Sequence, residues 1–309
     1  MLHIITDSAA DLPQSYIEEH HIHVIPTPVV IDGTDYLDGA TIRTVDFYNI
    51  LDDVKRDIKT YHINPAMFMD AFTPYAQAGD AVIYLCFSTG IAGTYNAANI
   101  ARSSLLEDYP DFDLTIIDSK SASIGFGLVV SKLVTLLERG ASREEIIEAA
   151  DYYISHIRHV FTVQTLAYLI KGGRLTKFKG IVAETLSMKP VLIVDENGAL
   201  SVLRTVRGRR KSIHALIEYA EEKGVHLEDQ TIAICHGEDP EALALAEAAV
   251  RTAFHPRSVL VSVVGCAIGA HTGRGIVGVC FFDEDDGKYA KYFSGDPKEK
   301  TVYTRHALN

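Results

Sequence analysis

Short apolar runs alternate with amphipathic stretches along the first half of the chain. The apolar runs, each about as long as one strand, are residues 2–6, 24–31, 81–87 and 114–117. Apolar residues at helical spacing fill the intervals, over residues 41–57, 65–77, 95–105, 123–138 and 142–156. Alternation of this kind predicts an α/β fold, with a mostly parallel sheet and helices on both of its faces.

The pattern changes near residue 159, where a second α/β unit is predicted. A short helix at 166–170 precedes a predicted β-hairpin over 190–204, whose turn is Asn197-Gly198. Further elements follow: a helix to 222, strands at 231–235, 259–263 and 276–282, and a helix at 240–253. Residues 265–275 are predicted to be a loop. We therefore expect two α/β domains: a Rossmann-like N-terminal domain at 1–158 and a C-terminal domain at 159–282 with a mixed sheet. A polar extension at 283–309 follows them.

Polar residues gather where the predicted parallel strands end. Ser88, Thr89 and Gly90 separate the strand at 81–87 from the next helix, and Asp7-Ser8 and Asp118-Ser119 end two further strands. Hydroxyls, a glycine and the free N–H groups of a helix start form a cradle for phosphate or carboxylate. The simpler alternative is an ordinary strand-to-helix turn capped by a hydroxyl. Ligands of parallel sheets bind at the carboxyl ends of the strands, which favours the binding interpretation.

The composition narrows the function further. The 309 residues carry a formal net charge of −12, which argues against general nucleic-acid binding because a phosphate backbone would be repelled. That charge does not oppose a small acidic ligand at a local cluster of donors. The four cysteines have no CxxC spacing, which indicates free thiols in a reducing compartment. Asp7 and Asp11 interrupt the apolar start that a signal peptide needs, so we expect a cytoplasmic protein. Asp11 is also predicted to cap a short helix that has Pro13 in its first turn.

Five separated motifs make the sequence similar to one known family. They lie in residues 4–13, 87–95, 118–127, 168–174 and 269–275, in one order along nearly the whole chain. With these motifs the chain resembles the DegV family, the bacterial fatty-acid-binding proteins of the FakB type. The resemblance implies two α/β domains with a long-chain acyl group held between or beneath them. It implies no cofactor besides this fatty-acid ligand, and no metal.

The resemblance also implies which residues hold the carboxylate. The first hydroxyl is that of Thr60, although residues 61–63 depart from the usual family pattern. Further contacts are expected from Ser88, Thr89 and Gly90, from His271 and Thr272, and from Arg174. For Arg174 the alternative is a structural ion pair. A histidine and an arginine suit this position because an imidazole donates to a carboxylate, and a nearby cation lowers the cost of burying its charge.

A basic cluster in this acidic chain is the candidate surface for a partner. It includes Arg204, Arg207 and Lys211, and it resembles the segment by which the family docks an ATP-dependent fatty-acid kinase. In that scheme the kinase phosphorylates the bound fatty acid to an acyl phosphate, and the binding protein is not itself an enzyme. The cluster would also suit transient contact with an anionic membrane surface. An ordinary solvated helix start is the remaining alternative.

Two other functions compete with the carrier hypothesis. The first is a serine-dependent esterase or thioesterase that uses Ser88 with His271, but the sequence has no GxSxG elbow. The second is a kinase subunit that binds a triose covalently through a histidine, and the DegV motifs argue against it. Hydroxyls without a committed base nearby in the sequence suit holding an anion better than attacking a carbonyl.

Overall fold

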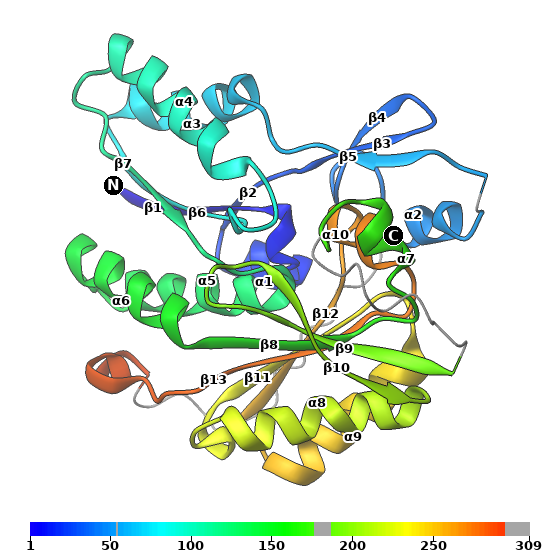
Figure 1. Cartoon of the computed structure of the whole chain (residues 1–309). Helices are drawn as coiled ribbons and strands as arrows, with labels where there is room; N and C mark the ends of the chain where they lie inside the picture. The colour runs from blue at the N-terminus through cyan, green and yellow to red at the C-terminus, as the bar shows by residue number, and fades with distance from the viewer. Residues whose placement is uncertain (54, 176–186, 294–309) are drawn as a thin grey trace.

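The computed structural model describes residues 1–53, 55–175 and 187–293, and it is built in layers (Figure 1). In the described residues a parallel sheet has the strand order β2 (His23–Ile25), β1 (Leu2–Asp7), β6 (Ala81–Cys86), β7 (Leu114–Asp118). Helices α3 (Pro65–Ala78) and α4 (Thr94–Asp108) lie above this sheet in Figure 1, and α5 (Ser123–Glu138) and α6 (Arg143–His156) lie below it. The predicted parallel sheet with helices on both faces is confirmed.

The second sheet is mixed, as expected. Its strand order in the described residues is β10 (Leu200–Arg207), β9 (Met188–Val194), β8 (Ile157–Thr162), β13 (Val277–Phe282), β11 (Thr231–His236), β12 (Ser258–Val263). Helices α8 (Arg209–Lys223) and α9 (Pro240–Phe254) cover its lower face, and α5 and α6 cover its upper face (Figure 1). The hairpin predicted over residues 190–204 is the β9–β10 pair.

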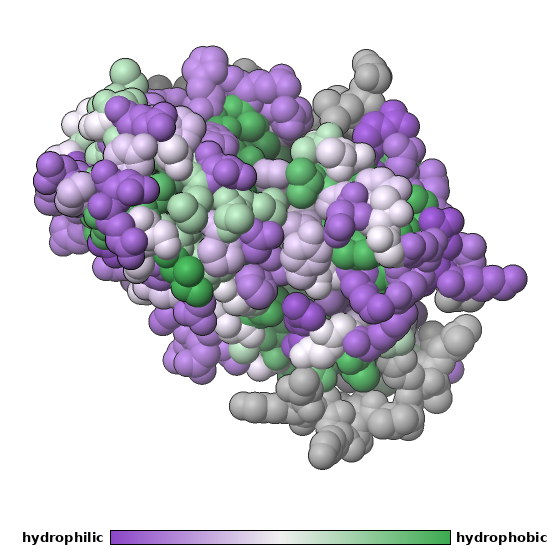
Figure 2. Space-filling view, turned by 90° about the horizontal axis from the view of Figure 1, so that it is seen from above, coloured by the Kyte–Doolittle hydropathy of each residue, from purple (hydrophilic) through white to green (hydrophobic). Residues whose placement is uncertain are grey.

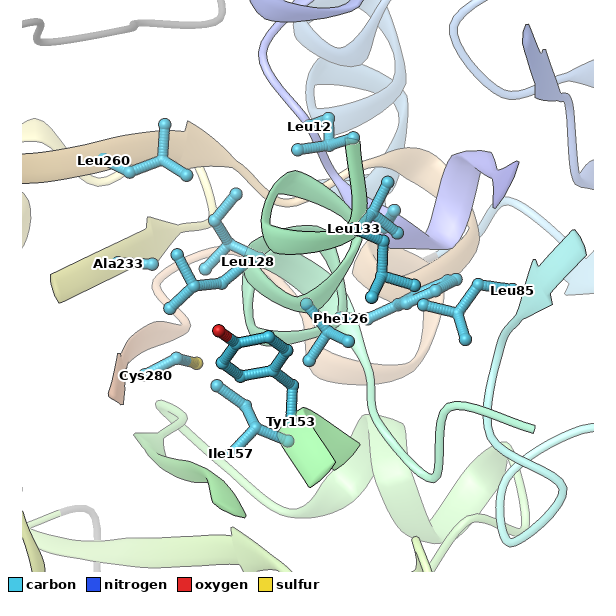
Figure 3. Packing of buried hydrophobic residues seen from close by; sticks show 14 of the residues in the cluster. Leu12, Leu85, Phe126, Leu128, Leu133, Tyr153, Ile157, Ala233, Leu260 and Cys280 are labelled. Carbon is cyan, nitrogen blue, oxygen red and sulfur yellow. The ribbon is translucent and has the colours of Figure 1, made fainter. Parts of the chain in front are cut away.

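Helix α5 therefore lies between the two sheets. Eleven of its sixteen residues are buried, and its apolar side chains face both ways. Around Phe126 and Leu128, one cluster collects Leu85 from the first sheet and Leu260 from the second (Figure 3). A helix that is apolar all round is typical of such a fully covered position.

A third, smaller sheet was not predicted. It consists of β4 (Thr34–Leu37), β3 (Pro28–Ile31) and β5 (Ile58–Thr60). The single strand predicted at 24–31 is wrong, because Pro26 and Pro28 interrupt the backbone ladder and divide it into β2 and β3. The helix predicted at 41–57 is shorter, since α2 spans Thr44–Leu51 and Asp52 and Asp53 at its end oppose the helix dipole.

Three further differences concern the chain connections. The predicted loop at 265–275 contains a helix, α10 (Cys266–Thr272), whose first N–H groups are bound by distant carboxylates. Strand β8 was not predicted, because the extended backbone begins at Ile157 directly after α6. The predicted domain boundary, residues 158 and 159, lies inside this strand and stays a prediction.

Helix α1 (Gln14–Glu19) begins after Pro13, as expected, but Asp11 does not cap it. Asp11 is buried with a left-handed backbone, and its carboxylate accepts from Ser123 Oγ at 2.5 Å and from Gly265 N at 2.8 Å. The polar extension continues as a 3₁₀ helix at Gly287–Tyr292, and residues 294–309 lie outside the described residues.

The surface is mixed rather than uniformly apolar. The face seen from above carries separate apolar areas among hydrophilic ones (Figure 2). None of the helices within the described ranges combines the length and the hydropathy needed to span a bilayer.

Candidate ligand-binding site

A largely apolar cavity is lined by residues from both large sheets and their loops. It contains about 900 Å³ that atoms do not fill, part of it open to solvent. Phe87 and Ile91 line it from the first sheet's side, and Phe161, Val194 and Leu200 line it from the second. A largely apolar lining with a few polar groups is typical of a site for a small organic molecule.

Three side chains form the boundary between this cavity and an outer cleft. Thr60, Arg174 and His271 line both of them. The outer cleft contains about 1200 Å³, open solvent included, and it is more polar, with Lys59 and Lys171 among its lining residues. A ligand group held by these three side chains would therefore be reached from the cleft, while the rest of the ligand would lie in the apolar cavity.

Thr60 and His271 are in direct contact, with 2.6 Å between Oγ1 and Nε2. The other ring nitrogen, Nδ1, is buried without a hydrogen-bond partner, and a Cβ on Gly172 would lie 2.0 Å from it. Burial, with a smaller effect of the Arg174 charge, lowers the pKa of His271 to about 4, so the ring is neutral at pH 7. The tautomer with its proton on Nε2 donates to Thr60 and leaves no N–H buried without an acceptor. The hydroxyl proton of Thr60 is then free to donate to a ligand.

Arg174 supplies the positive charge at this boundary. Its Nη1 donates to the carbonyl of Gly172 at 2.6 Å, and burial lowers its pKa, although a guanidinium stays charged at neutral pH. Among the described residues that line the apolar cavity, no Asp, Glu or Lys is present. One cation beside a hydroxyl donor suits a ligand with a single negative charge.

Distant carboxylates hold the helix that carries His271. Asp38 accepts from Cys266 N at 2.9 Å and from Ala267 N at 3.2 Å, and Asp11 accepts from Gly265 N at 2.8 Å. Both carboxylates are buried, and both oppose the unpaired N–H groups at the start of α10. The N-terminal half of the chain thus positions the histidine in the last turn of this seven-residue helix.

The predicted cradle at residues 88–90 is used within the protein. Ser88 is fully buried, and its hydroxyl donates to the Gly198 carbonyl at 2.7 Å. Thr89 Oγ1 donates to Asp118 Oδ2 at 2.6 Å. A Cβ on Gly90 would lie 2.6 Å from Gly198, so this turn packs closely against the tip of the β9–β10 hairpin. These three residues do not line the cavity, and their contact with a ligand stays a prediction.

Thr272 and the Ser88–His271 pair are the remaining predictions for the site. Thr272 lines the cavity, but its hydroxyl donates to Ile268 O at 3.1 Å within its own helix. The pair of Ser88 and His271 that an esterase would need is not formed, because Nε2 of the histidine contacts Thr60. The structure therefore places Thr60, Arg174, His271 and Thr272 in the cavity lining. Ser88 lies outside it, with its hydroxyl on the Gly198 carbonyl.

Several lining residues were missed in the sequence. Thr94, the first residue of α4, lines the cavity, as do Tyr61 and His62 beside Thr60. His159 lines it from β8. Thr94 follows Gly93 at a predicted helix start, which is a signal that could have been used. His159 lies on a strand that the sequence pattern did not reveal.

The basic cluster lies apart from this cavity. Arg204 pairs with Glu218, whereas Arg207 and Lys211 line a separate cleft beside Asp239. Its role in docking stays a prediction.

Comparison with known proteins identifies the family. The sequence profile described as "Uncharacterised protein, DegV family COG1307" matches residues 1–284. A DegV domain-containing protein of Clostridium perfringens is 35% identical over 286 residues, 91% of this chain and 97% of the relative. The chain belongs to the DegV family.

Solved structures similar to this DegV-family protein include lipid-binding proteins. A stearic acid-binding protein from Eubacterium ventriosum matches with a TM-score of 0.82 and 29% identity, covering 94% of this chain and 100% of that one. A DegV lipid-binding protein from Thermotoga maritima matches with a TM-score of 0.80 and 28% identity, covering 91% and 98%. DegV from Bacillus subtilis, described as a fatty acid-binding protein, has a TM-score of 0.80 and 27% identity, covering 91% and 98%.

Proposed function

We propose that this protein binds a long-chain fatty acid and presents its carboxylate to an ATP-dependent fatty-acid kinase. The carboxylate lies between Thr60, Arg174 and His271, and the acyl chain lies in the apolar cavity. The observation that carries the proposal is that these three side chains line both the apolar cavity and the outer polar cleft. They lie where the charged end of an amphiphile would meet both environments.

The charges and donors support a monocarboxylate. Thr60 has a hydroxyl proton to donate once His271 donates to it, and Arg174 provides one positive charge. A hydrogen bond to a charged group contributes about 1.5–3 kcal/mol, so these contacts orient the ligand as well as hold it. The apolar wall supplies most of the binding free energy, roughly 0.8 kcal/mol for each CH₂ group removed from water. The lipid ligands of the similar structures point the same way.

The outer cleft supports presentation to a second protein. In the transfer, a carboxylate oxygen forms a bond to the γ-phosphorus of ATP while the bond to the β-phosphate oxygen breaks, giving an acyl phosphate and ADP. Lys59 and Lys171 line the cleft outside the carboxylate position. Because Lys59 pairs with Asp57 at 2.6 Å, Lys171 is the stronger candidate to attract the phosphates. The kinase binds ATP and catalyses the transfer. Among the described residues the Ser88 hydroxyl donates to the Gly198 carbonyl and has no base in contact, so Ser88 is not set up as a nucleophile. The protein then acts in the cytoplasm as a carrier without a cofactor, and Arg204, Arg207 and Lys211 are candidates for docking.

Native mass spectrometry of the purified protein, followed by solvent extraction, tests fatty-acid binding. We expect a bound fatty acid at one per chain, and a large loss of it in Thr60→Val, which removes the hydroxyl at nearly constant volume. Thr73→Val is the matched control, because that hydroxyl donates to Met69 O within α3 and does not line the cavity. A protein that stays empty when offered free fatty acids would refute the proposal.

The presentation step needs its own assay. The loaded protein, ATP and a bacterial fatty-acid kinase should give an acyl phosphate that hydroxylamine traps as the hydroxamate. Arg207→Glu and Lys211→Glu should slow this reaction without changing the fatty-acid content. Normal binding with no hydroxamate from any such kinase would refute presentation and leave binding intact.

A further inference from the structure

A buried histidine adds an unpaired polar group to the wall of the apolar cavity. His159 on β8 is 5% exposed and lines this cavity but not the outer cleft. Its Nε2 lies 2.6 Å from the hydroxyl of Ser121. The other ring nitrogen, Nδ1, has no hydrogen-bond partner among the described residues. Because His159 lines the cavity and its Nε2 contacts Ser121, Nδ1 is the ring nitrogen that remains for a ligand there.

The contact with Ser121 determines which nitrogen carries the proton. Ser121 is fully buried, and His159 is the partner of its hydroxyl. If the ring donated to Ser121, the serine O–H would be buried without an acceptor, which is costly. The hydroxyl therefore donates to Nε2, and the proton of the neutral ring lies on Nδ1. Burial and the charge of Arg158 lower the pKa of His159 to about 3, so the ring has one N–H and no charge at pH 7.

The ring is also held in place. A Cβ on Gly125 of α5 would lie 2.2 Å from Nε2 of His159, so the ring packs directly against the helix backbone. The neighbouring groups in the wall do not use the free N–H. Ser123 donates to Asp11, and burial raises the pKa values of the Cys235 and Cys280 thiols, which are therefore neutral. His159 thus presents a fixed N–H donor beside the uncharged side chains of Cys235 and Cys280.

We propose that the preferred ligand is an oxygenated long-chain fatty acid, whose chain carries a neutral oxygen that accepts from Nδ1 of His159. This inference rests on the proposed fatty-acid binding and specifies the class of chain. A plain saturated chain would leave the donor without a partner in an apolar wall. A double bond offers its π face, which is a weaker acceptor than oxygen. A keto oxygen needs a single donor and matches the site fully, and a hydroxyl oxygen accepts equally but keeps a proton of its own.

Competition binding to the delipidated full chain tests this inference. The probes are stearic acid, oleic acid, and positional series of oxostearic and hydroxystearic acids. We expect at least one oxygenated isomer to bind about fivefold more tightly than stearic acid, the effect of one net hydrogen bond. This preference should disappear in His159→Phe, while stearic acid still binds. Phe161→Leu is the control for shape, since it changes the same cavity without a polar group and should leave the preference in place.

A second variant covers the case in which His159→Phe does not fold. Ser121→Ala removes the group that sets the tautomer, so ¹⁵N shifts should show Nδ1–H in the native protein and a mixture in the variant. The preference for oxygenated chains should fall in parallel. Equal binding of stearic acid and every oxygenated isomer overturns the inference, as does a preference that persists in His159→Phe. If no fatty acid binds at all, the proposed function itself fails.

Discussion

Gly172→Ala tests whether the position of His271 controls ligand binding. Gly172 has backbone angles of φ −76° and ψ −7°, which alanine adopts freely, so the substitution adds no backbone strain. Its new Cβ, however, would lie 2.0 Å from Nδ1 and 2.8 Å from Cε1 of His271. Because atoms at these distances overlap, the imidazole has to move away and its contact with Thr60 at 2.6 Å breaks.

The size of the effect follows from what the contact does. Without His271, the Thr60 hydroxyl is no longer oriented toward the ligand, and one hydrogen bond to a charged group is lost, about 1.5–3 kcal/mol. The dissociation constant of a fatty acid should therefore rise by a factor of about 10 to 150. The change in stability should be smaller, since overpacking costs about 1–3 kcal/mol and replacing glycine returns about 0.4–1 kcal/mol.

Displacement of a fluorescent fatty acid gives the dissociation constant, and urea unfolding gives the stability. Gly173→Ala is the matched control, because a Cβ there meets no atom within 4 Å although its φ of +72° strains alanine. The control should lose stability and keep its affinity. A double-mutant cycle with His271→Ala isolates the coupling, since Gly172→Ala should have little effect once the ring is gone. An unchanged affinity in the single variant would refute this account of the site.

Three further outcomes are expected. Gly198→Ala should displace the tip of the β9–β10 hairpin, because its Cβ would lie 2.1 Å from the Ser88 hydroxyl oxygen. Fatty-acid exchange measured by stopped flow should then become faster, and an unchanged exchange rate would contradict this. Asp38→Ala removes a carboxylate that accepts from the first N–H groups of α10, so the free energy of unfolding should decrease by about 1–2 kcal/mol and ligand binding should weaken. Unchanged ligand affinity would show that this carboxylate does not position α10. The pKa values of His159 and His271, about 3 and 4, lie below the unfolded value, so their stabilising effect is lost as pH falls below about 6.5. Burial raises the pKa of Asp7 to about 6, so protonation of this carboxyl stabilises the folded state as the pH falls. Because two histidines oppose one carboxyl, the free energy of unfolding should decrease by about 1.4 kcal/mol for each pH unit between pH 6 and 4. Urea titrations at several pH values measure the free energy of unfolding, and a value that rises on acidification would contradict this prediction.

The sequence predicted the elements that have strong local patterns. The run at 81–87 and the following helix are β6 and α4, and Ser142 begins α6 with a capping box to Glu145. The third sheet and α10 escaped prediction because their stability comes from distant contacts. Helix α10 begins where Asp38 and Asp11 meet it, more than 200 residues along the chain.

Part of the candidate site was named in advance, although ligand contact at these residues stays a prediction. The family resemblance named Thr60, Arg174 and His271, yet only the fold shows that they share one boundary, since Thr60 and His271 are 211 positions apart in the sequence. The Ser88 hydroxyl was expected at the carboxyl end of its strand and does lie there, but its acceptor is a hairpin from the other sheet. Hydrogen bonds between sheets leave no periodic signal in a sequence.

The position of α5 limits how a ligand can enter. Leu85 and Leu260 pack in the same cluster on this helix although they belong to different sheets, so separating the sheets would expose the apolar core that they share. A hinge motion that separates the two sheets is therefore energetically costly, and a ligand should enter through local opening of the loops around the cavity. The same shared core makes the two sheets one cooperative unit, so heat or denaturant should melt them together rather than one after the other.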